Sequence, residues 1–215
     1  MSKLLNFNKV LCISPHPDDV ELAMLGTIMK YTDTEFHVLC LTICGAKGFD
    51  DSYKLGRADE VMALWKFVKC SNVTTIYSDY DFFEDKTEPG WINYIENDLV
   101  DFDSYDCIFT PPNEDSMLEH RLVNRLGHPL IRHYPISLIE YHTTSTLNGW
   151  TPNLFIDVGE QYEAKKLALQ HFKSQIGKQY FSDSAMLAKH TNFQCAKKGI
   201  DITEQFCIKE IIYWR

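Results

Sequence analysis

The chain has 215 residues, of which 45% are hydrophobic and 13% are aromatic. A chain of this length and composition can bury a substantial core, and we expect one globular domain spanning residues 1–215. The formal net charge is −9 and the pI is about 5.3. This charge speaks against nucleic-acid binding, because neutralising phosphates requires clustered Lys and Arg. A small or uncharged substrate is the expected partner.

The sequence predicts no membrane span, no secretion signal and no disulfides. The amino-terminal stretch "MSKLLNFNKVLCIS" lacks a long apolar region with a small-residue cleavage site, and no stretch reaches the ~18 apolar residues of a membrane span. We therefore expect a cytoplasmic protein. The cysteines are odd in number and never form a C-x-x-C pair, which predicts reduced core residues. They are Cys12, Cys40, Cys44, Cys70, Cys107, Cys195 and Cys207.

Short β-rich runs alternate with helical segments along the chain. In order, the runs are "KVLCIS", "FHVLCLTIC", "VTTIYS", "DCIFTP" and "ISLIEYH", and the helical segments between them begin near Val20, Ser52, Trp91 and Glu119. This alternation predicts an α/β fold, a Rossmann-like, mostly parallel sheet flanked by helices on both faces. No repeat or low-complexity linker divides the chain.

Two helical segments have an apolar stripe. In "ADEVMALWKFV", Val61, Leu64, Trp65 and Val68 follow the i, i+3, i+4, i+7 spacing of an amphipathic helix. A later segment, "GEQYEAKKLALQHF", also predicts a helix, with Tyr162, Leu167 and Leu169 as its less regular apolar positions.

The stretch "SPHPDDVELAMLG", residues 14–26, places charge directly after the first predicted strand. Adjacent carboxylates at the edge of a core repel each other, which suggests a cation beside them. His16 and Asp19 lie three residues apart, so one turn can direct both at one metal ion. Asp18 would then stay free to accept a proton from water. The alternative is a helix N-cap, which accounts for one aspartate only.

A third metal ligand should come from another strand end, because catalytic zinc keeps three protein ligands and an open position. Ligands of an open parallel sheet bind beyond the carboxyl ends of its strands. The segment "TPPNEDSMLEHRLVNRL" follows the fourth predicted strand and offers four candidates, namely Glu114, Asp115, Glu119 and His120.

With these motifs the sequence resembles the LmbE-like (PIG-L) family of metal-dependent N-deacetylases. The stretch "PHPDDVEL…GTI" is similar to the family's first motif, and "GRADEVMALW" and "PNLFIDVGEQYEAKKLALQHFKSQ" are similar to later parts. The resemblance implies that His16, Asp19 and His120 bind the metal and that Asp18 is the general base. The implied metal is Zn²⁺, with another divalent ion such as Fe²⁺ as the alternative.

The family's second motif, H-x-D-H, is only partly kept. In register its positions are Met117, Leu118, Glu119 and His120, so the histidine that stabilises the oxyanion in the family is replaced by Met117 beside the substrate. We expect Glu119 to hold His120 or a neighbouring histidine by a hydrogen bond rather than to bind the ion.

Three further residues are candidates for the site. By the resemblance Arg57 faces the substrate, with a helix-surface ion pair as the alternative, and Asp81 matches the acid that family members carry after the third strand. His142 closes the run "ISLIEYH", so its ring could replace the hydrogen bond lost at Met117. Packing at the strand end is the alternative for His142.

The resemblance implies a hydrolase that converts an N-acetylglucosamine-type sugar or conjugate into a free amine and acetate. The rival interpretation is a sugar-binding or regulatory member of the same fold that has lost turnover, with Met117 as its main support. Nucleotide-dependent and serine-hydrolase activities are disfavoured, because the G-x-G-x-x-G, P-loop and G-x-S-x-G motifs are missing. The sequence is compatible with a homo-oligomer as well as with a monomer.

Overall fold

The computed structural model describes residues 3–43 and 51–212, and side chains in the second range from residue 56 onward. In these residues the strands are β1 (Lys9–Ser14), β2 (Glu35–Cys40), β3 (Val73–Tyr77), β4 (Cys107–Thr110), β5 (Ser137–Tyr141), β6 (Leu154–Asp157) and β7 (Thr203–Glu210). The α-helices are α1 (Asp19–Lys30), α2 (Asp51–Val68), α3 (Glu88–Tyr94), α4 (Leu118–Ile131), α5 (Tyr162–Leu169), α6 (Asp183–His190) and α7 (Phe193–Ala196). The five predicted strands and the predicted helices are all present.

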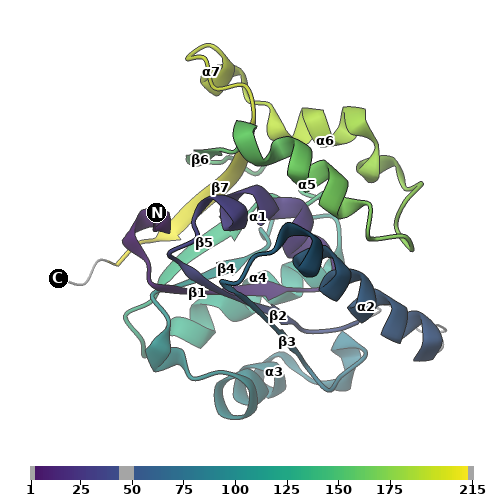
Figure 1. Ribbon diagram of the computed structural model, residues 1–215. Helices are drawn as coiled ribbons and strands as arrows, with labels where there is room; N and C mark the ends of the chain where they lie inside the picture. The colour runs from purple at the N-terminus through teal and green to yellow at the C-terminus, as the bar shows by residue number, and fades with distance from the viewer. Residues whose placement is uncertain (1–2, 44–50, 213–215) are drawn as a thin grey trace.

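The strands form one mixed sheet in the order β3-β2-β1-β4-β5-β7-β6 (Figure 1). Strands β1 to β5 pair in parallel, whereas β7 runs antiparallel to both β5 and β6. The predicted α/β class with a mostly parallel sheet and helices on both faces is confirmed. The strands β6 and β7 have no counterpart among the five β-rich runs identified from sequence.

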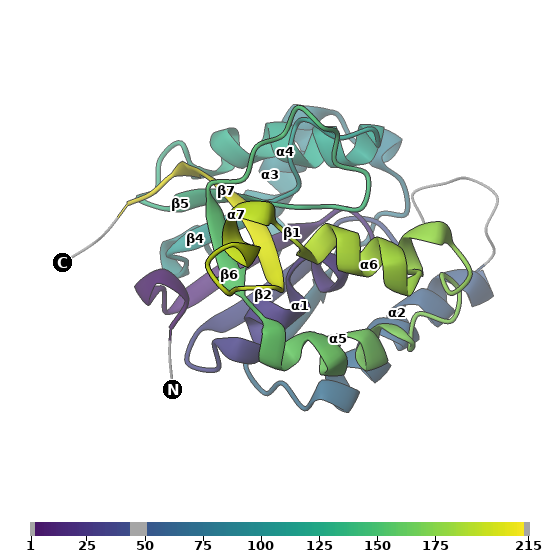
Figure 2. The same cartoon turned by 90° about the horizontal axis from the view of Figure 1, so that it is seen from above.

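Helices cover both faces of the sheet, and a separate apolar core lies between the sheet and the helices on each face. One core cluster joins the sheet to α1, α2, α5 and α6, and the other joins it to α3 and α4. The two layers are seen from above in Figure 2. The predicted stripe of α2 faces the first cluster, where Val61, Leu64 and Trp65 are buried and Val68 packs against them.

The cysteines within the described ranges are free thiols, as expected, and four of the six are buried. Cys44 lies outside the described residues. No helix in the described part of the chain is both long enough and apolar enough to cross a membrane.

The order of the strands shows where a ligand site is expected. From β1 the chain builds outward through β2 and β3, and then returns to add β4 and β5 on the other side of β1. The crevice between the carboxyl ends of β1 and β4 is therefore a topological switch point, where open α/β sheets bind their ligands. Both charged segments singled out from sequence follow these two strands.

Candidate metal centre

The turn between β1 and α1 is tightly held. The Ser14 hydroxyl donates to the His16 carbonyl at 2.6 Å, and Asp18 occupies the N-cap position of α1 with a φ of 131°, in a region that non-glycine residues rarely adopt. The Asp18 carboxylate makes no capping hydrogen bond. The N-cap alternative therefore does not account for this side chain.

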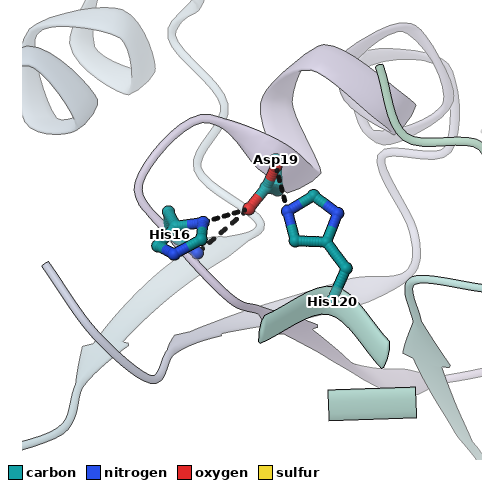
Figure 3. Close-up of side chains that lie close together, drawn as sticks. All are labelled: His16, Asp19 and His120. Carbon is teal, nitrogen blue, oxygen red and sulfur yellow. Dashed lines mark hydrogen bonds and ion pairs between the residues drawn. The ribbon is translucent and has the colours of Figure 1, made fainter. Parts of the chain in front are cut away.

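Asp19 lies between two histidines that come from different strand ends (Figure 3). Its Oδ2 is 3.3 Å from His16 Nδ1, and its Oδ1 is 3.3 Å from Nε2 of His120, which is on the first turn of α4. The backbone N–H of His16 also donates to Asp19 Oδ2 at 3.0 Å. We call His16, Asp19 and His120 the metal cluster.

The metal cluster fits a divalent cation. One ligand atom from each side chain lies within 4.8 Å of the other two. Two imidazole nitrogens and a carboxylate oxygen form a donor set that zinc accepts, with a position left for water or substrate. The three residues that the sequence predicted as metal ligands are thus brought together from β1, α1 and α4.

The electrostatics of the metal cluster also favour positive charge. Burial acts to raise the pKa of Asp19, but His120 and His16 outweigh it and hold this pKa below its ordinary value. Burial acts to lower the pKa of His120, but the carboxylates of Asp19 and Asp115 outweigh it and raise this pKa to about 10. The carboxylates around His120 thus favour positive charge at this place, which a bound metal ion would supply.

The carboxylate that orients His120 is that of Asp115. Its Oδ2 lies 3.0 Å from His120 Nδ1, and Asp115 itself is fully buried. The hydroxyls of Ser145 and Thr143 donate to Asp115, and the Met117 N–H donates to its Oδ1 at 2.8 Å. Burial acts to raise the pKa of Asp115, but His120 and the hydroxyls outweigh it and lower this pKa.

The carboxylate next to His120 Nδ1 is thus that of Asp115, whereas the sequence predicted that Glu119 holds His120 or a neighbouring histidine. Glu119 precedes His120 on α4, and neighbouring residues of a helix lie about 100° apart around its axis and do not face each other. Asp115 precedes the helix and turns back toward it. The signal available in the sequence was the hydroxyl-rich stretch "HTTST" after the fifth strand, which supplies the donors that Asp115 requires.

Arg57 is buried against Asp18 rather than exposed to solvent. Its Nη2 lies 3.2 Å from Asp18 Oδ2 and also donates to the Pro17 carbonyl, while Nη1 donates to Ser174 at 3.1 Å. Burial raises the pKa of Asp18 to about 6, and the Arg57 guanidinium opposes this change. The geometry supports the ion-pair alternative for Arg57, but buried instead of on the helix surface, because a buried carboxylate needs a counter-charge.

The remaining candidates from the sequence are Met117, Asp81 and His142. Met117 is 41% exposed at the N-terminus of α4, and Asp81 is half-buried in the segment after β3. The His142 ring stacks on Trp150 with 5.0 Å between ring centroids, and its Nδ1 is buried without a partner among the described residues. Burial lowers the pKa of His142 to about 2, so its ring is neutral.

The family comparison agrees with this site. The family model of PIG-L, described as GlcNAc-PI de-N-acetylase, matches residues 11–131, which is more than half of the chain and includes the whole metal cluster. The chain therefore belongs to the PIG-L family. A diacetylchitobiose deacetylase of Thermococcus kodakarensis is 24% identical to it over 187 residues, which cover 78% of this chain and 70% of that protein.

Solved structures share the fold. The N,N′-diacetylchitobiose deacetylase of Pyrococcus horikoshii has a TM-score of 0.73 at 21% identity, covering 96% of this chain and 85% of that one. The 4-carboxy-2-hydroxymuconate hydratase of Pseudomonas putida has a TM-score of 0.71 at 14% identity, covering 97% and 98%. Because a deacetylase and a hydratase share this fold, the function has to be argued from the site.

Proposed function

We propose that the chain is a metal-dependent N-deacetylase that hydrolyses the N-acetyl group of an N-acetylglucosamine-type sugar or conjugate to a free amine and acetate. The observation that carries the proposal is the convergence of His16, Asp19 and His120 within 4.8 Å, with the buried Asp18 next to them in the chain. The family description and the name of the Thermococcus relative support an N-acetylated sugar as the substrate.

The metal cluster would hold the ion, which we propose to be Zn²⁺, with Fe²⁺ as the alternative because two histidines and one carboxylate also suit ferrous iron. When bound, the ion supplies Lewis-acid polarisation of the amide carbonyl and makes water easier to deprotonate. Asp115 keeps the His120 ring oriented through Nδ1, leaving Nε2 directed at the cluster.

Asp18 carries the proton in this proposal. Its carboxylate accepts a proton from the attacking water while the water oxygen bonds to the amide carbon. It then returns this proton to the amide nitrogen as the C–N bond breaks, which yields the amine and acetate. Arg57 fixes the orientation of the Asp18 carboxylate through the 3.2 Å contact with Oδ2. A pKa near 6 suits a group that must both take and release a proton near neutral pH.

The developing negative charge on the carbonyl oxygen needs a donor that Met117 cannot supply, since a thioether is only a weak acceptor. We propose that His142 or an ordered water provides this hydrogen bond. Asp81 and Met117 are proposed to contact the substrate.

A second candidate function is a sugar-binding or regulatory protein without turnover. The exposed Met117 at the start of α4 favours it. The presence of Asp18 counts against it, because metal binding alone does not require that residue.

The test is acetate release by protein loaded with Zn²⁺ or Fe²⁺, measured on N,N′-diacetylchitobiose and a panel of N-acetylglucosamine derivatives. We expect acetate and free amine in equal amounts, and no release after the ion is removed by a chelator. Sugar binding without acetate from any substrate would replace this proposal by the second candidate.

A further inference from the structure

Helix α1, which begins at the metal cluster, is interrupted in its middle. Met24 has φ −140° and ψ 18°, which is not helical. In a regular helix, Gly26 and Thr27 would donate to the carbonyls four residues earlier. Here the Gly26 N–H donates to Glu204 Oε1 at 2.9 Å and the Thr27 N–H donates to Glu204 Oε2 at 2.6 Å. The Leu22 carbonyl, the regular acceptor for Gly26, instead accepts from Lys165 Nζ at 2.9 Å.

Lys165 and Glu204 also bind each other, so a buried ion pair occupies the break in the helix. Lys165 Nζ lies 2.5 Å from Glu204 Oε1, and neither side chain is exposed to solvent. The third partner of Nζ is His190 Nε2 at 2.9 Å, and His190 Nδ1 donates to the Met186 carbonyl at 2.7 Å. We call Lys165, Glu204 and His190 the ion-pair cluster. Its members come from α5, β7 and α6.

This arrangement does more than fill the core. A buried ion pair is weak evidence for stability, because apolar residues of similar volume often stabilise a core as well or better. An apolar pair, however, could not satisfy the Leu22 carbonyl and the two freed N–H groups of α1. The absence of a side chain at Gly26 allows this close approach, since a Cβ there would lie 2.9 Å from Val158 Cβ and 3.0 Å from Glu204 Oε1.

The break is one helical turn from the proposed active site. The Leu22 N–H donates to the Asp18 carbonyl at 2.8 Å, while the Leu22 carbonyl accepts from Lys165. A single residue therefore links the ion pair to the backbone of Asp18. That backbone is strained at φ 131° and needs the surrounding structure to hold it.

We propose that Lys165 and Glu204 are positioning residues that fix the direction of the first turn of α1 and thereby aim Asp19 and Asp18 at the metal position. This inference rests on the metal site of the proposed function. Lys165 and Glu204 themselves touch neither metal nor substrate in this assignment.

The test compares Lys165→Met with Leu169→Ala. Leu169 is a buried residue one turn further along α5 in the same core, so its truncation disturbs packing without removing a hydrogen bond to α1. Three quantities are measured for both variants: the melting temperature, the affinity for Co²⁺ from its visible absorption, and the hydrogen-exchange rate of the Leu22 amide in metal-free protein.

We expect Lys165→Met to weaken Co²⁺ binding about tenfold or more, the usual scale for groups that support metal ligands. Its Co²⁺ spectrum should change and its Leu22 amide should exchange faster. Leu169→Ala should lower the melting temperature while Co²⁺ affinity and Leu22 exchange stay close to wild type. Wild-type affinity and exchange in Lys165→Met, or equal effects in Leu169→Ala, would overturn the inference.

Glu204→Gln is the second variant, in case Lys165→Met does not fold. It is nearly isosteric and replaces one acceptor oxygen by an NH₂ group that faces the N–H groups of α1, so it should shift all three quantities in the same direction. If the wild-type protein binds no Co²⁺, this result contradicts the metal dependence of the proposed function. Leu22 exchange then still decides the positioning role, because it is measured without metal.

Discussion

The metal cluster and the ion-pair cluster both lie beside helix α1, and each places a carboxylate against basic side chains. They differ in the group that provides the positive charge. In the ion-pair cluster, the ammonium of Lys165 lies between Glu204 and His190, at 2.5 Å and 2.9 Å. In the metal cluster, Asp19 is 3.3 Å from each of two histidines, and the carboxylates of Asp19 and Asp115 raise the pKa of His120.

We infer from this difference that the ion-pair cluster is structural and that the metal cluster is the proposed functional site. The three N–H groups of Lys165 each have an acceptor, so nothing can be exchanged there without breaking the core. A proton on imidazole can leave, and its place can be taken by a metal ion that polarises a substrate. Substitutions in and around the metal cluster and one pH profile test this contrast, from the largest expected effect to the smallest.

Removing a ligand should abolish metal binding. We expect the purified protein to hold about one divalent ion per chain, and His120→Ala to lose it, because a catalytic site depends on all three protein ligands. Metal content is measured by elemental analysis. His128→Ala is the matched control, since His128 is an exposed histidine on the same helix. Unchanged metal content in His120→Ala would defeat the assignment.

Removing the proposed base should leave the metal in place. Asp18→Asn is expected to keep the ion and lose roughly 10² or more in turnover, as general-base catalysis contributes on this scale. Both quantities are measured on the same preparation. Equal loss of metal and activity would mean that the roles of Asp18 and Asp19 are reversed.

The pH profile of the wild type provides the control for Asp18. Burial raises the pKa of Asp18 to about 6, and a base acts only when it is deprotonated. Turnover should therefore fall as the pH drops through this region, with the midpoint moved lower when a bound cation adds positive charge nearby. A profile that stays flat from pH 8 to pH 4 contradicts the assignment.

The replacement for the missing histidine at position 117 can be identified with two variants. If His142 is the donor, His142→Ala should lower turnover about 10²–10³-fold with metal content intact, the usual cost of one oxyanion donor, and Met117→His should add little. If nothing replaces it, Met117→His should raise turnover and His142→Ala should be nearly silent. Absence of deacetylation in wild type and Met117→His alike, with metal bound, favours the binding-protein function.

The smallest effect concerns the partner of His120. Asp115→Asn should weaken metal affinity about 10–100-fold, because it removes the carboxylate that orients the ligand ring. Glu119→Gln should leave the affinity within about twofold of wild type, since the hydrogen bond to Nδ1 belongs to Asp115. The opposite order of the two variants would restore the original expectation for Glu119.

The sequence by itself determined the features that depend on near neighbours. His16, Asp18 and Asp19 lie within one turn, so their spacing alone predicts that two of them face one ion while the third carboxylate is left to act on water, and the substitutions above test these roles. The central strands β1 and β4 were readable because parallel strands buried on both faces are nearly continuous apolar runs. Strand β7, "TEQFCIKE", carries polar residues in its interior, and only its pairing with β5 and β6 defines it.

The tertiary structure decided which polar residues are buried. In α5 the sequence pattern makes Leu167 an apolar position of the helix, yet Leu167 is 60% exposed and Lys165 is fully buried. The reason lies outside the helix: Glu204, which is 39 residues away in sequence, supplies the carboxylate that makes burial of the lysine tolerable. Asp115 meets Ser145 and Thr143 in the same way, through contacts that local periodicity does not contain.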